Sequence, residues 1–428
     1  MNILIKSAKI IDPNSKYHNE IMDVFIKNGT IERIAKSINS CAKSIANGTE
    51  KEFCAKNLHL SPGWFDFHTN FGEPGYEQNE TIKTGCNAAI KGGYTGVMLM
   101  PNNIPFIDNK SMIEFVKNKS TDSIVDIIPA GNITKNCLGD SIVEMHDMSK
   151  SGCKAFTDDK NSVSRNDVMK VAMLYSKDCD TLIMNYPNDK SISKNGVMHE
   201  GITSTLLGLK GIPYLSEDMM VDRDISLLKY TDARFHLSYI STKESVIKIK
   251  RAKSIGLKLS ADVALHNLFL TDEDVNNFDT RYKVQPPLRT QNDNKALIAS
   301  LKDGTIDIIC TDHTPVTDEN KKVEFDNALN GIIGLESAFG LLGKYILPKI
   351  GLESLIEKIS INPRKILKIK EVSINIGEKA NITLFDPEIN WNFSVNDIKS
   401  KSRNTPYIGK KLKGKALAII NNGQFIDC

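Results

Sequence analysis

The sequence carries very little net charge, because 55 lysines and arginines oppose 52 aspartates and glutamates and leave a formal charge of +3. Nucleic-acid-binding surfaces need clustered cations, often interleaved with aromatic residues, and the sequence contains no such cluster. No apolar run reaches membrane-spanning length, and the first residues, MNILIKSAKIIDPNS, are too short and too interrupted by charge for a signal peptide. We therefore expect a cytoplasmic protein that binds neither nucleic acid nor membrane.

Closely spaced cysteine pairs are also missing. The eight cysteines show no C-x-x-C spacing, which argues against a zinc finger and favours reduced thiols over a disulfide framework. With 428 residues, 40% of them hydrophobic and 25% charged, the chain has the composition of an ordinary soluble protein. It is long enough for one domain of about 250 residues plus a smaller appended domain. The cysteines are Cys41, Cys54, Cys86, Cys137, Cys153, Cys179, Cys310 and Cys428.

Both ends of the chain have the pattern of β-structure. Short apolar runs separated by turn residues occur in the first sixty residues (ILIKSAKII, DVFIKNGTIERIA) and again in the last sixty (ANITLFDP, ALAIINNGQFI). This arrangement predicts that residues 1–58 and 366–428 together build one small composite β-sandwich.

The region between these ends alternates strand and helix patterns. Apolar runs such as TGVMLM, VDIIPAG and DIICTDH are candidate strands, and NETIKTGCNAAIKG and TKESVIKIKRAKSIG have apolar residues at helical spacing. Such alternation indicates parallel βα units, and about eight of them indicate a closed (β/α)8 barrel. We assign this barrel to residues 59–365.

Residues 62–70, PGWFDFHTN, are the first motif with chemical content. An apolar run that ends in Asp66 and His68 is typical of a barrel strand that presents an imidazole at its mouth. A second histidine two residues later could reach the same metal ion, because alternate residues of a strand share a face. Asn70 occupies that position. Taken alone, the motif favours a buried structural histidine beside a turn over a metal ligand, and the segments that follow it change that balance.

The downstream segment GEPGYEQNETIKTGCNAAIKGGYTGVMLMPNNIPFIDN resembles the dihydroorotases of the cyclic amidohydrolase superfamily. Further matching segments follow in order, among them GCKAFTDD (152–159), HLSYISTKESV (236–246), LKLSADVALHNLFLTDED (257–274) and LKDGTIDIICTDHTP (301–315). The resemblance implies a distorted (β/α)8 amidohydrolase barrel and a hydrolase of pyrimidine biosynthesis. The implied reaction is the reversible cyclisation of N-carbamoyl-L-aspartate to dihydroorotate.

The resemblance also implies a zinc site of one or two ions. In metal-dependent dihydroorotases, histidines, a bridging carboxylate and a final aspartate hold the zinc, and that aspartate also moves a proton. The matching metal ligands in this chain are His68, Asp158 or Asp159, and Asp312, with Asp312 as the catalytic residue. Three expected histidine positions are substituted, by Asn70, Tyr186 (or Asn185, if the alignment shifts by one residue) and Tyr239.

A lysine offers one possible compensation for these losses. Hydantoinases carry a carboxylated lysine that bridges two metals in a setting similar to CKAF, which would make Lys154 a carbamate ligand. An exposed lysine at the start of a strand is the alternative interpretation.

The substrate-binding residues are also partly substituted. Where the family places an arginine that pairs with the substrate carboxylate, this chain has Gly72, so Arg289 in PPLRT is the nearest candidate for that contact. Asn102 and His313 match further substrate-contacting positions, whereas His236 and His266 are expected to have structural roles.

Two other functions are compatible with these substitutions. One is a non-catalytic subunit that scaffolds aspartate transcarbamoylase, a role that some metal-free relatives fill. The other is a hydantoinase-like or dihydropyrimidinase-like amidohydrolase, which depends mainly on Lys154. We expect the protein to form a homo-oligomer.

Overall fold

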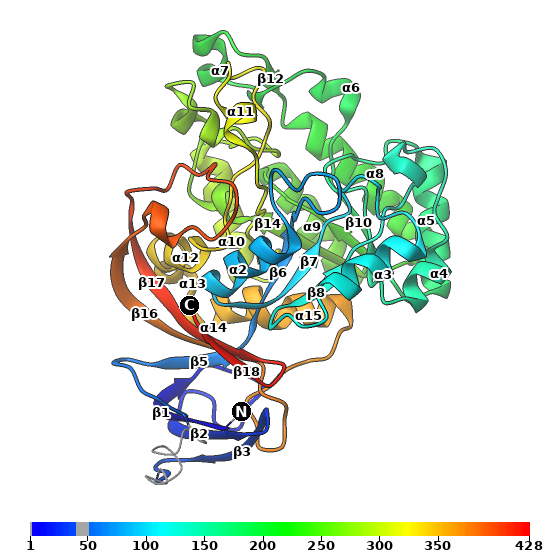
Figure 1. The fold of residues 1–428 in the computed structure, drawn as a ribbon. Coiled ribbons are helices and arrows are strands. Elements are labelled where there is room, and N and C mark those ends of the chain that lie inside the picture. Colours follow the sequence, from blue (N-terminus) through cyan, green and yellow to red (C-terminus); the bar gives the residue numbers. More distant parts are fainter. Residues whose placement is uncertain (1, 40–50) are drawn as a thin grey trace.

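The protein, described by a computed structural model, has two parts (Figure 1). One is an eight-stranded sheet made from both chain ends, and the other is a set of parallel strands with flanking helices. The structure describes residues 2–39 and 51–428, so Cys41 lies outside the described residues. The strands are β1 (Asn2–Ile10), β2 (Ile21–Lys27), β3 (Thr30–Ala35), β4 (Lys51–Phe53), β5 (His59–Pro62), β6 (Trp64–Thr69), β7 (Tyr94–Leu99), β8 (Asp126–Pro129), β9 (Ala155–Phe156), β10 (Leu182–Asn185), β11 (Met198–His199), β12 (Gly211–Ile212), β13 (Phe235–Leu237), β14 (Leu259–Ala264), β15 (Ile308–Cys310), β16 (Ile382–Asn392), β17 (Lys411–Asn421) and β18 (Gln424–Asp427).

Along the chain, most helices follow one parallel strand and precede the next. The α-helices are α2 (Ile82–Gly92), α3 (Lys110–Lys119), α4 (Met145–Lys150), α5 (Asn166–Asp178), α6 (Lys190–Ser193), α7 (Ile202–Leu207), α8 (Leu215–Thr231), α9 (Lys243–Ser254), α10 (Gln291–Lys302), α11 (Asp318–Lys321), α12 (Ala338–Tyr345), α13 (Leu347–Ile350), α14 (Leu352–Ile356) and α15 (Asn362–Leu367). Short 3-10 turns and one π-helical turn are η1 (Lys135–Cys137), η2 (Leu265–Leu268), η3 (Asp272–Val275), η4 (Thr280–Tyr282), η5 (Glu357–Ile361) and η6 (Val395–Asp397).

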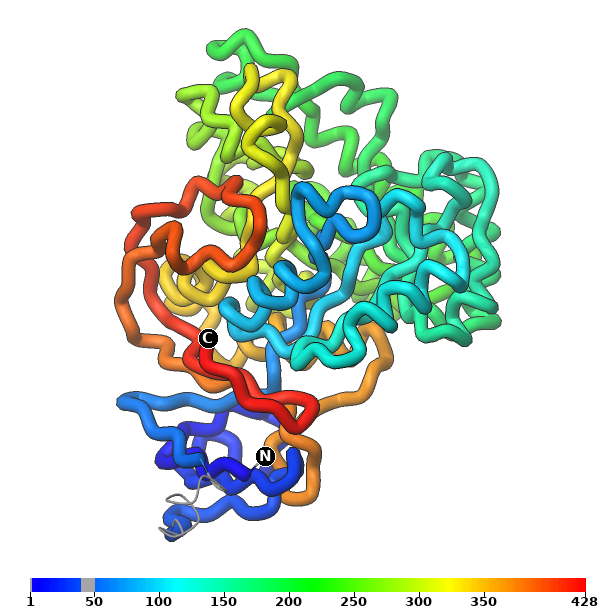
Figure 2. The backbone as a smooth tube through the Cα atoms, in the orientation of Figure 1, coloured from blue at the N-terminus to red at the C-terminus, as the bar shows by residue number. Residues whose placement is uncertain are grey.

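The eight-stranded sheet has the order β18-β17-β16-β5-β1-β2-β3, and β4 pairs with β1 outside this path. The antiparallel pairing of β5 with β16 joins the N-terminal strands to the C-terminal strands. Figure 2 shows the C-terminal segment returning to the N-terminal strands. Inward-facing side chains form a separate apolar core for this part of the molecule, with Ile3, Ile5, Val24, Leu60 and Ile382 fully buried.

The parallel strands follow one another in cyclic order. β6, β7 and β8 pair in one group, and β9, β10, β13, β14 and β15 pair in another. Single parallel bridges between Thr69 and His313 and between Gly131 and Phe156 connect the two groups. Every residue of β6, β7 and β15 is buried, as expected where helices cover one face of parallel strands and packed side chains cover the other. Their carboxyl ends therefore meet at one edge.

Local sequence determines where the first helix after β6 begins and ends. Thr81 caps α2 by accepting a hydrogen bond from the Thr84 backbone N–H, and the Thr84 side chain returns the contact. Gly93 ends the helix at φ 85°, a backbone conformation that favours glycine. A Cβ atom there would also lie 2.9 Å from the Trp64 ring. The tight turn thus brings α2 directly against β6 and β7.

An aromatic cluster connects the eight-stranded sheet to the parallel strands. The ring centroid of Trp64 lies 4.4 Å from that of Phe339 and 5.4 Å from that of Phe385. Beside it, the buried Arg364 guanidinium donates to the backbone oxygens of Gly63 and Ser360. These contacts hold the start of β6 in place, and β6 is the strand that carries His68.

Two further observations describe the molecule as a whole. In the described part of the chain, no helix is both long enough and apolar enough to cross a membrane. The seven cysteines in this part are all free thiols, and several are buried. This result is consistent with the reduced thiols predicted from the sequence.

A buried lysine predicts how the stability of the fold depends on pH. Burial, together with the nearby Lys283 ammonium, lowers the pKa of Lys321 to about 7. Unfolding restores the ordinary value near 10.5, so the unfolded chain binds more protons between pH 7 and 10. The Lys321 contribution to the free energy of unfolding should therefore rise by about 1 kcal/mol per pH unit in this range.

Urea denaturation at pH 7 and at pH 9.5 measures this effect. Lys321→Met should lose the additional rise in stability, whereas Lys322→Met, which changes a neighbouring exposed lysine, should keep it. Equal pH dependence in the wild type and in Lys321→Met would contradict the prediction.

Candidate functional site

Polar side chains gather at the edge where the parallel strands end. They come from residues that lie within the strands or shortly after them, and most are buried. The set comprises His68 (β6), Asn70 (after β6), Asn102 (after β7), Asp159 and Lys160 (after β9), Tyr186 (after β10), His236 (β13), Tyr239 (after β13), Asp262 (β14), His266 (η2) and Asp312 (after β15).

Two histidines share one carboxylate at the centre of this set. The Nε2 atoms of His68 and His236 lie 2.5 Å and 2.6 Å from the same Asp262 oxygen, Oδ2. Burial alone would lower the pKa of His68, but the Asp262 carboxylate outweighs it and raises the pKa above its usual value. The two imidazoles also hold the pKa of Asp262 below its usual range, although burial acts to raise it. The three residues therefore form a buried, charge-assisted hydrogen-bond cluster.

The three residues of this cluster could also hold a metal ion, since their ligand atoms all lie within 4.8 Å of one another. A zinc ion sits about 2.0 to 2.2 Å from each ligand atom in a tetrahedral site, which separates two ligand atoms by roughly 3.4 Å. The nitrogen–oxygen distances of 2.5 Å and 2.6 Å are instead those of direct hydrogen bonds. An ion at this position would have to break both of them.

An ion pair occupies the neighbouring part of the site. The Lys160 ammonium lies 2.6 Å from Oδ1 and 2.8 Å from Oδ2 of Asp312, whose side chain is fully buried. The same ammonium is 5.0 Å from the centroid of the Tyr239 ring. Burial raises the pKa of the Asp312 carboxyl to about 6, even though Lys160 acts in the opposite direction. Asp312 thus has a cation as its partner on both carboxylate oxygens.

A chain of hydrogen bonds links Asn70 and Tyr239, two of the three substituted positions, through Asn102 and Asp159. The Tyr239 hydroxyl donates to Asp159 Oδ1 over 2.9 Å, and Asn102 donates both to Asp159 Oδ2 and to Asn70 Oδ1. Asn70 in turn donates to the Thr314 hydroxyl. Each polar group at these positions therefore has a partner within the protein.

The two tyrosines remain neutral phenols. Burial raises the pKa of Tyr186 above its usual value near 10, and burial together with the Asp159 carboxylate raises that of Tyr239 still more clearly. The rings meet edge to face with centroids 6.2 Å apart, and Tyr239 also packs on His68 at 4.1 Å. A neutral phenol is a poor zinc ligand compared with imidazole.

The backbone is strained at three positions of the site. Asp159, Tyr239 and Asp312 have φ values of 46°, 57° and 52°, in the left-handed region that residues with side chains seldom adopt. Such strain persists only where the surrounding structure enforces it, and it is common at functional sites. At this site the Tyr239 hydroxyl donates to Asp159, and Asp312 pairs with the Lys160 ammonium that faces the Tyr239 ring.

Three residues predicted to act at the site either bond to other groups or lie away from the site. Asp158 is buried, but its carboxylate accepts hydrogen bonds from the backbone N–H groups of Ile133 and Thr134. His313 accepts the Gly334 N–H at Nδ1, and its Nε2 lies 3.6 Å from Glu80. Lys154 is exposed at the entry to β9, whereas the site lies beyond the carboxyl end of that strand, so we do not propose it as a carbamate ligand.

Arg289 and His266 are both buried. The Arg289 guanidinium is buried and donates to the Ser241 hydroxyl and to the Ile212 carbonyl, with Glu217 4.0 Å away. His266 Nε2 lies 3.7 Å from Asp312 Oδ2, and burial lowers its pKa to about 3. His266 is therefore a neutral neighbour of the Lys160–Asp312 ion pair.

Sequence reasoning missed Lys160 and Asp262 and assigned His236 to a structural role. Two signals in the sequence could have revealed them. Asp262 interrupts the apolar strand segment LSADVAL, where a charged residue needs a partner. Lys160 directly follows the two aspartates of FTDD, so it lies next to a carboxylate that was already a candidate.

The residues present do not fit a two-zinc centre. Asn70, Tyr186 and Tyr239 stand where the family resemblance implies imidazoles. An ammonium occupies the Asp312 carboxylate, and His68 and His236 share Asp262. Aside from the His68, His236 and Asp262 cluster, no group of three or more His, Cys, Asp or Glu ligand atoms with this spacing occurs in residues 2–39 and 51–428.

A polar cavity lies at the mouth of the site. It has a volume of about 320 Å³ and includes Lys160 in its lining. Two further lysines, Lys190 and Lys194, add positive charge, and the remaining polar lining residues are the amides Asn188, Asn195, Gln285 and Asn330 together with Ser193. An anionic small molecule in this cavity would therefore meet complementary charge beside the Lys160 partner of Asp312.

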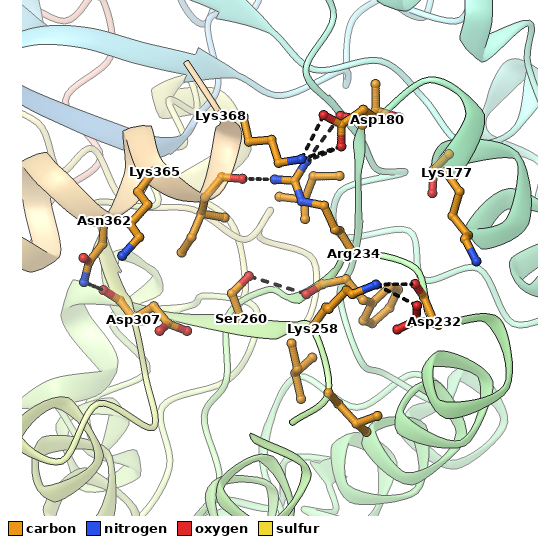
Figure 3. Close-up of a pocket in the computed structure, with 17 residues that line it drawn as sticks. Lys177, Asp180, Asp232, Arg234, Lys258, Ser260, Asp307, Asn362, Lys365 and Lys368 are labelled. Atoms are coloured by element: carbon orange, nitrogen blue, oxygen red, sulfur yellow. Dashed lines mark hydrogen bonds and ion pairs between the residues drawn. The ribbon is translucent and has the colours of Figure 1, made fainter. Parts of the chain in front are cut away.

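A larger cavity is at the opposite ends of the strands. It measures about 680 Å³ and is lined by the first residues of β10, β13 and β14 (Figure 3). Its lining has more cationic than acidic side chains, but Lys368 pairs with Asp180 and Lys258 pairs with Asp232. In enzymes built from parallel βα units, catalytic residues come from the carboxyl ends of the strands. We therefore place the candidate active site at the smaller cavity.

A substitution separates the roles of the two adjacent aspartates. Asp158→Ala should lower the free energy of unfolding by about 1 to 3 kcal/mol, because two buried backbone N–H groups would lose their acceptor. Urea denaturation measures the change, with Lys154→Ala as a control at a nearby exposed residue. Unchanged stability of Asp158→Ala would show that the carboxylate has no structural role.

Comparison with known proteins gives consistent results. Residues 58–245 match a family model described as dihydro-orotase-like. The chain is 42% identical over 427 residues to a dihydroorotase of Thermoanaerobacter sp. (strain X514), covering 99% of this chain and 97% of that protein. It is 38% identical over 428 residues to a dihydroorotase of Geobacter metallireducens, covering 100% and 99%.

Solved structures show a related fold. An L-hydantoinase from Arthrobacter aurescens superposes with a TM-score of 0.86 at 18% identity, covering 100% of this chain and 96% of that one. A dihydropyrimidinase from Brevibacillus agri gives a TM-score of 0.84 at 19% identity, covering 100% and 95%. At such low identity the likeness concerns the fold alone, which is that of α/β amidohydrolases.

Proposed function

Because the chain belongs to the dihydroorotase family of cyclic amidohydrolases, we propose that it catalyses the reversible cyclisation of N-carbamoyl-L-aspartate to dihydroorotate. The observation that carries this proposal is the position of Asp312. Its buried carboxylate follows the last parallel strand, at the end of the strands where the cationic cavity opens. A carboxylate in this position can move a proton between water and the substrate nitrogen.

The charge of the cavity supports an acidic substrate. N-carbamoyl-L-aspartate has two carboxylates, and Lys160, Lys190 and Lys194 line the cavity through which it would enter. Gly72 provides no cation at the position where an arginine was expected, and the buried Arg289 is already engaged by protein groups. We therefore propose that the lysines of the cavity, rather than Arg289, attract the substrate carboxylates. The amides of the lining and Asn102 would orient it.

The reaction in the hydrolytic direction needs one proton to move twice. Water adds to the carbonyl carbon of the ring amide as Asp312 takes a proton from it, and the C–N bond then breaks as Asp312 returns that proton to the nitrogen. Lys160 holds the Asp312 carboxylate at both oxygens and places a positive charge where the carbonyl oxygen becomes negative. Cyclisation follows the same steps in reverse.

Members of the family are generally metal-dependent, and the His68, His236 and Asp262 cluster is the candidate position for one ion here. Because the remaining residues do not fit the expected zinc centre, no step of this mechanism relies on zinc.

The mutation Asp312→Asn tests this proposal directly. Loss of the proton carrier should reduce dihydroorotase turnover by about 10² to 10⁴-fold. The assay follows dihydroorotate hydrolysis with purified protein, and thermal unfolding checks that the variant is folded. Asp318→Asn, which changes an exposed aspartate on α11, is the matched control and should keep full activity. Undiminished turnover in Asp312→Asn would exclude the role given to this carboxylate.

A second candidate function is favoured by one specific observation. The direct ion pair of Lys160 with Asp312, together with the substituted histidine positions, is also what a non-catalytic subunit would tolerate. In that case the protein would scaffold aspartate transcarbamoylase, and Asp312→Asn would support growth of a pyrimidine-requiring host as well as the wild type does. No comparable observation favours a hydantoinase, because Lys154 is exposed.

We also propose a finer description of the architecture. The cyclic order of the parallel strands supports a distorted (β/α)8 barrel over residues 59–365, and the eight-stranded sheet supports a composite β-sandwich from residues 1–58 and 366–428. A cytoplasmic location and a homo-oligomeric state remain predictions.

A further inference from the structure

We infer that the Lys160 ammonium takes the place of a metal ion in this site, so that the cation needed by its carboxylates is part of the chain itself. The inference goes beyond the proposed function, because it concerns the charge of the site whether or not the reaction is catalysed.

The contacts of Lys160 resemble those of a cation held by ligands. Its nitrogen lies within 2.8 Å of both oxygens of Asp312, and it faces the ring of Tyr239 at 5.0 Å. The Tyr239 hydroxyl in turn donates to Asp159. One ammonium thus lies among groups from three parallel strands, which is the position that a shared ion would occupy.

The substitutions around Lys160 are consistent with each other. A chain that kept imidazoles at the positions of Tyr186 and Tyr239 would direct lone pairs toward this space. The neutral phenol of Tyr239 instead brings a hydroxyl donor for Asp159 and an aromatic face for the ammonium, and Tyr186 packs edge to face on the Tyr239 ring. Asn70 and Asn102 likewise offer amides that satisfy each other and Asp159. Together the four side chains suit an organic cation and not a divalent ion.

Electrostatic repulsion makes the two alternatives exclusive. A divalent ion bound to Asp312 would lie within a few ångström of the ammonium, where like charges repel strongly in a buried site. Lys160 would have to leave the carboxylate before an ion could bind. The side chain of Lys160 is only 16% exposed, so its withdrawal would also require a rearrangement of the cavity mouth.

The test counts metal ions instead of turnover. The full-length protein is dialysed against a chelator, titrated with zinc, and followed by elemental analysis and by thermal unfolding. The wild type should retain clearly less than one zinc ion per chain, and added zinc should not raise its unfolding temperature. Lys160→Met should bind zinc at least about tenfold more tightly, since the adjacent like charge is gone.

Three control variants define the position of the effect. Lys160→Arg keeps the charge, and Lys190→Met removes a cavity lysine that bonds Asn161 and not Asp312, so both should bind zinc as weakly as the wild type. The double variant Lys160→Met with Asp312→Asn should lose the gain, because the carboxylate that would receive the ion is absent. It also provides a variant without the buried unpaired charge if Lys160→Met is unstable.

Two results would overturn the inference. One is tightly retained zinc in the wild type after dialysis, which would show that Lys160 and a metal coexist. The other is a folded Lys160→Met protein whose zinc affinity equals that of the wild type. Neither result depends on dihydroorotase activity, so failure of the proposed function and failure of this inference can be distinguished.

Discussion

Buried negative charge is the constraint on which the site depends. Asp159, Asp262 and Asp312 are all buried at the carboxyl ends of parallel strands, where an uncompensated carboxylate is costly. The charge of each carboxylate is compensated in a different way. Asp262 is shared by two imidazoles, Asp159 accepts hydrogen bonds from a phenol and an amide, and Asp312 is held by an ammonium. Removal of any of these partners would leave a buried charge alone, which explains why the surrounding residues are so closely connected.

The fold supplies the geometry that makes this compensation possible. Lys160 and Asp312 are 152 residues apart in sequence, and they meet only because parallel strands bring their carboxyl ends to one edge. The aromatic cluster around Trp64 and the buried Arg364 fix the start of β6, while the strained turns at Asp159, Tyr239 and Asp312 direct side chains inward. The rigid sheet and helices thus hold a few polar groups at short distances from one another.

Much of the architecture could be predicted from the sequence, because the signals for it are local. The segment TGVMLM covers β7 from its second residue to its end, and NETIKTGCNAAIKG contains α2 together with its capping threonine. The family assignment from ordered motifs is confirmed by the full-length relatives. The partners of individual site residues were harder to predict. Asp158 and Asp159 are adjacent and chemically identical, and only the three-dimensional position of the Ile133 and Thr134 N–H groups separates their roles.

The role of Lys160 was also hard to predict because its partner, Asp312, is distant in the sequence. Motif comparison asks whether an expected ligand is present, and at Asn70, Tyr186 and Tyr239 it reports only losses. It does not ask what fills the space and balances the charge once those ligands are gone. A lysine beside an aspartate pair is common along a chain, yet in space its ammonium pairs with Asp312, which follows a different strand. Substitutions at metal-ligand positions are therefore better interpreted together with new charges nearby, because the electrostatic requirement of the remaining carboxylates persists after the ligands have changed.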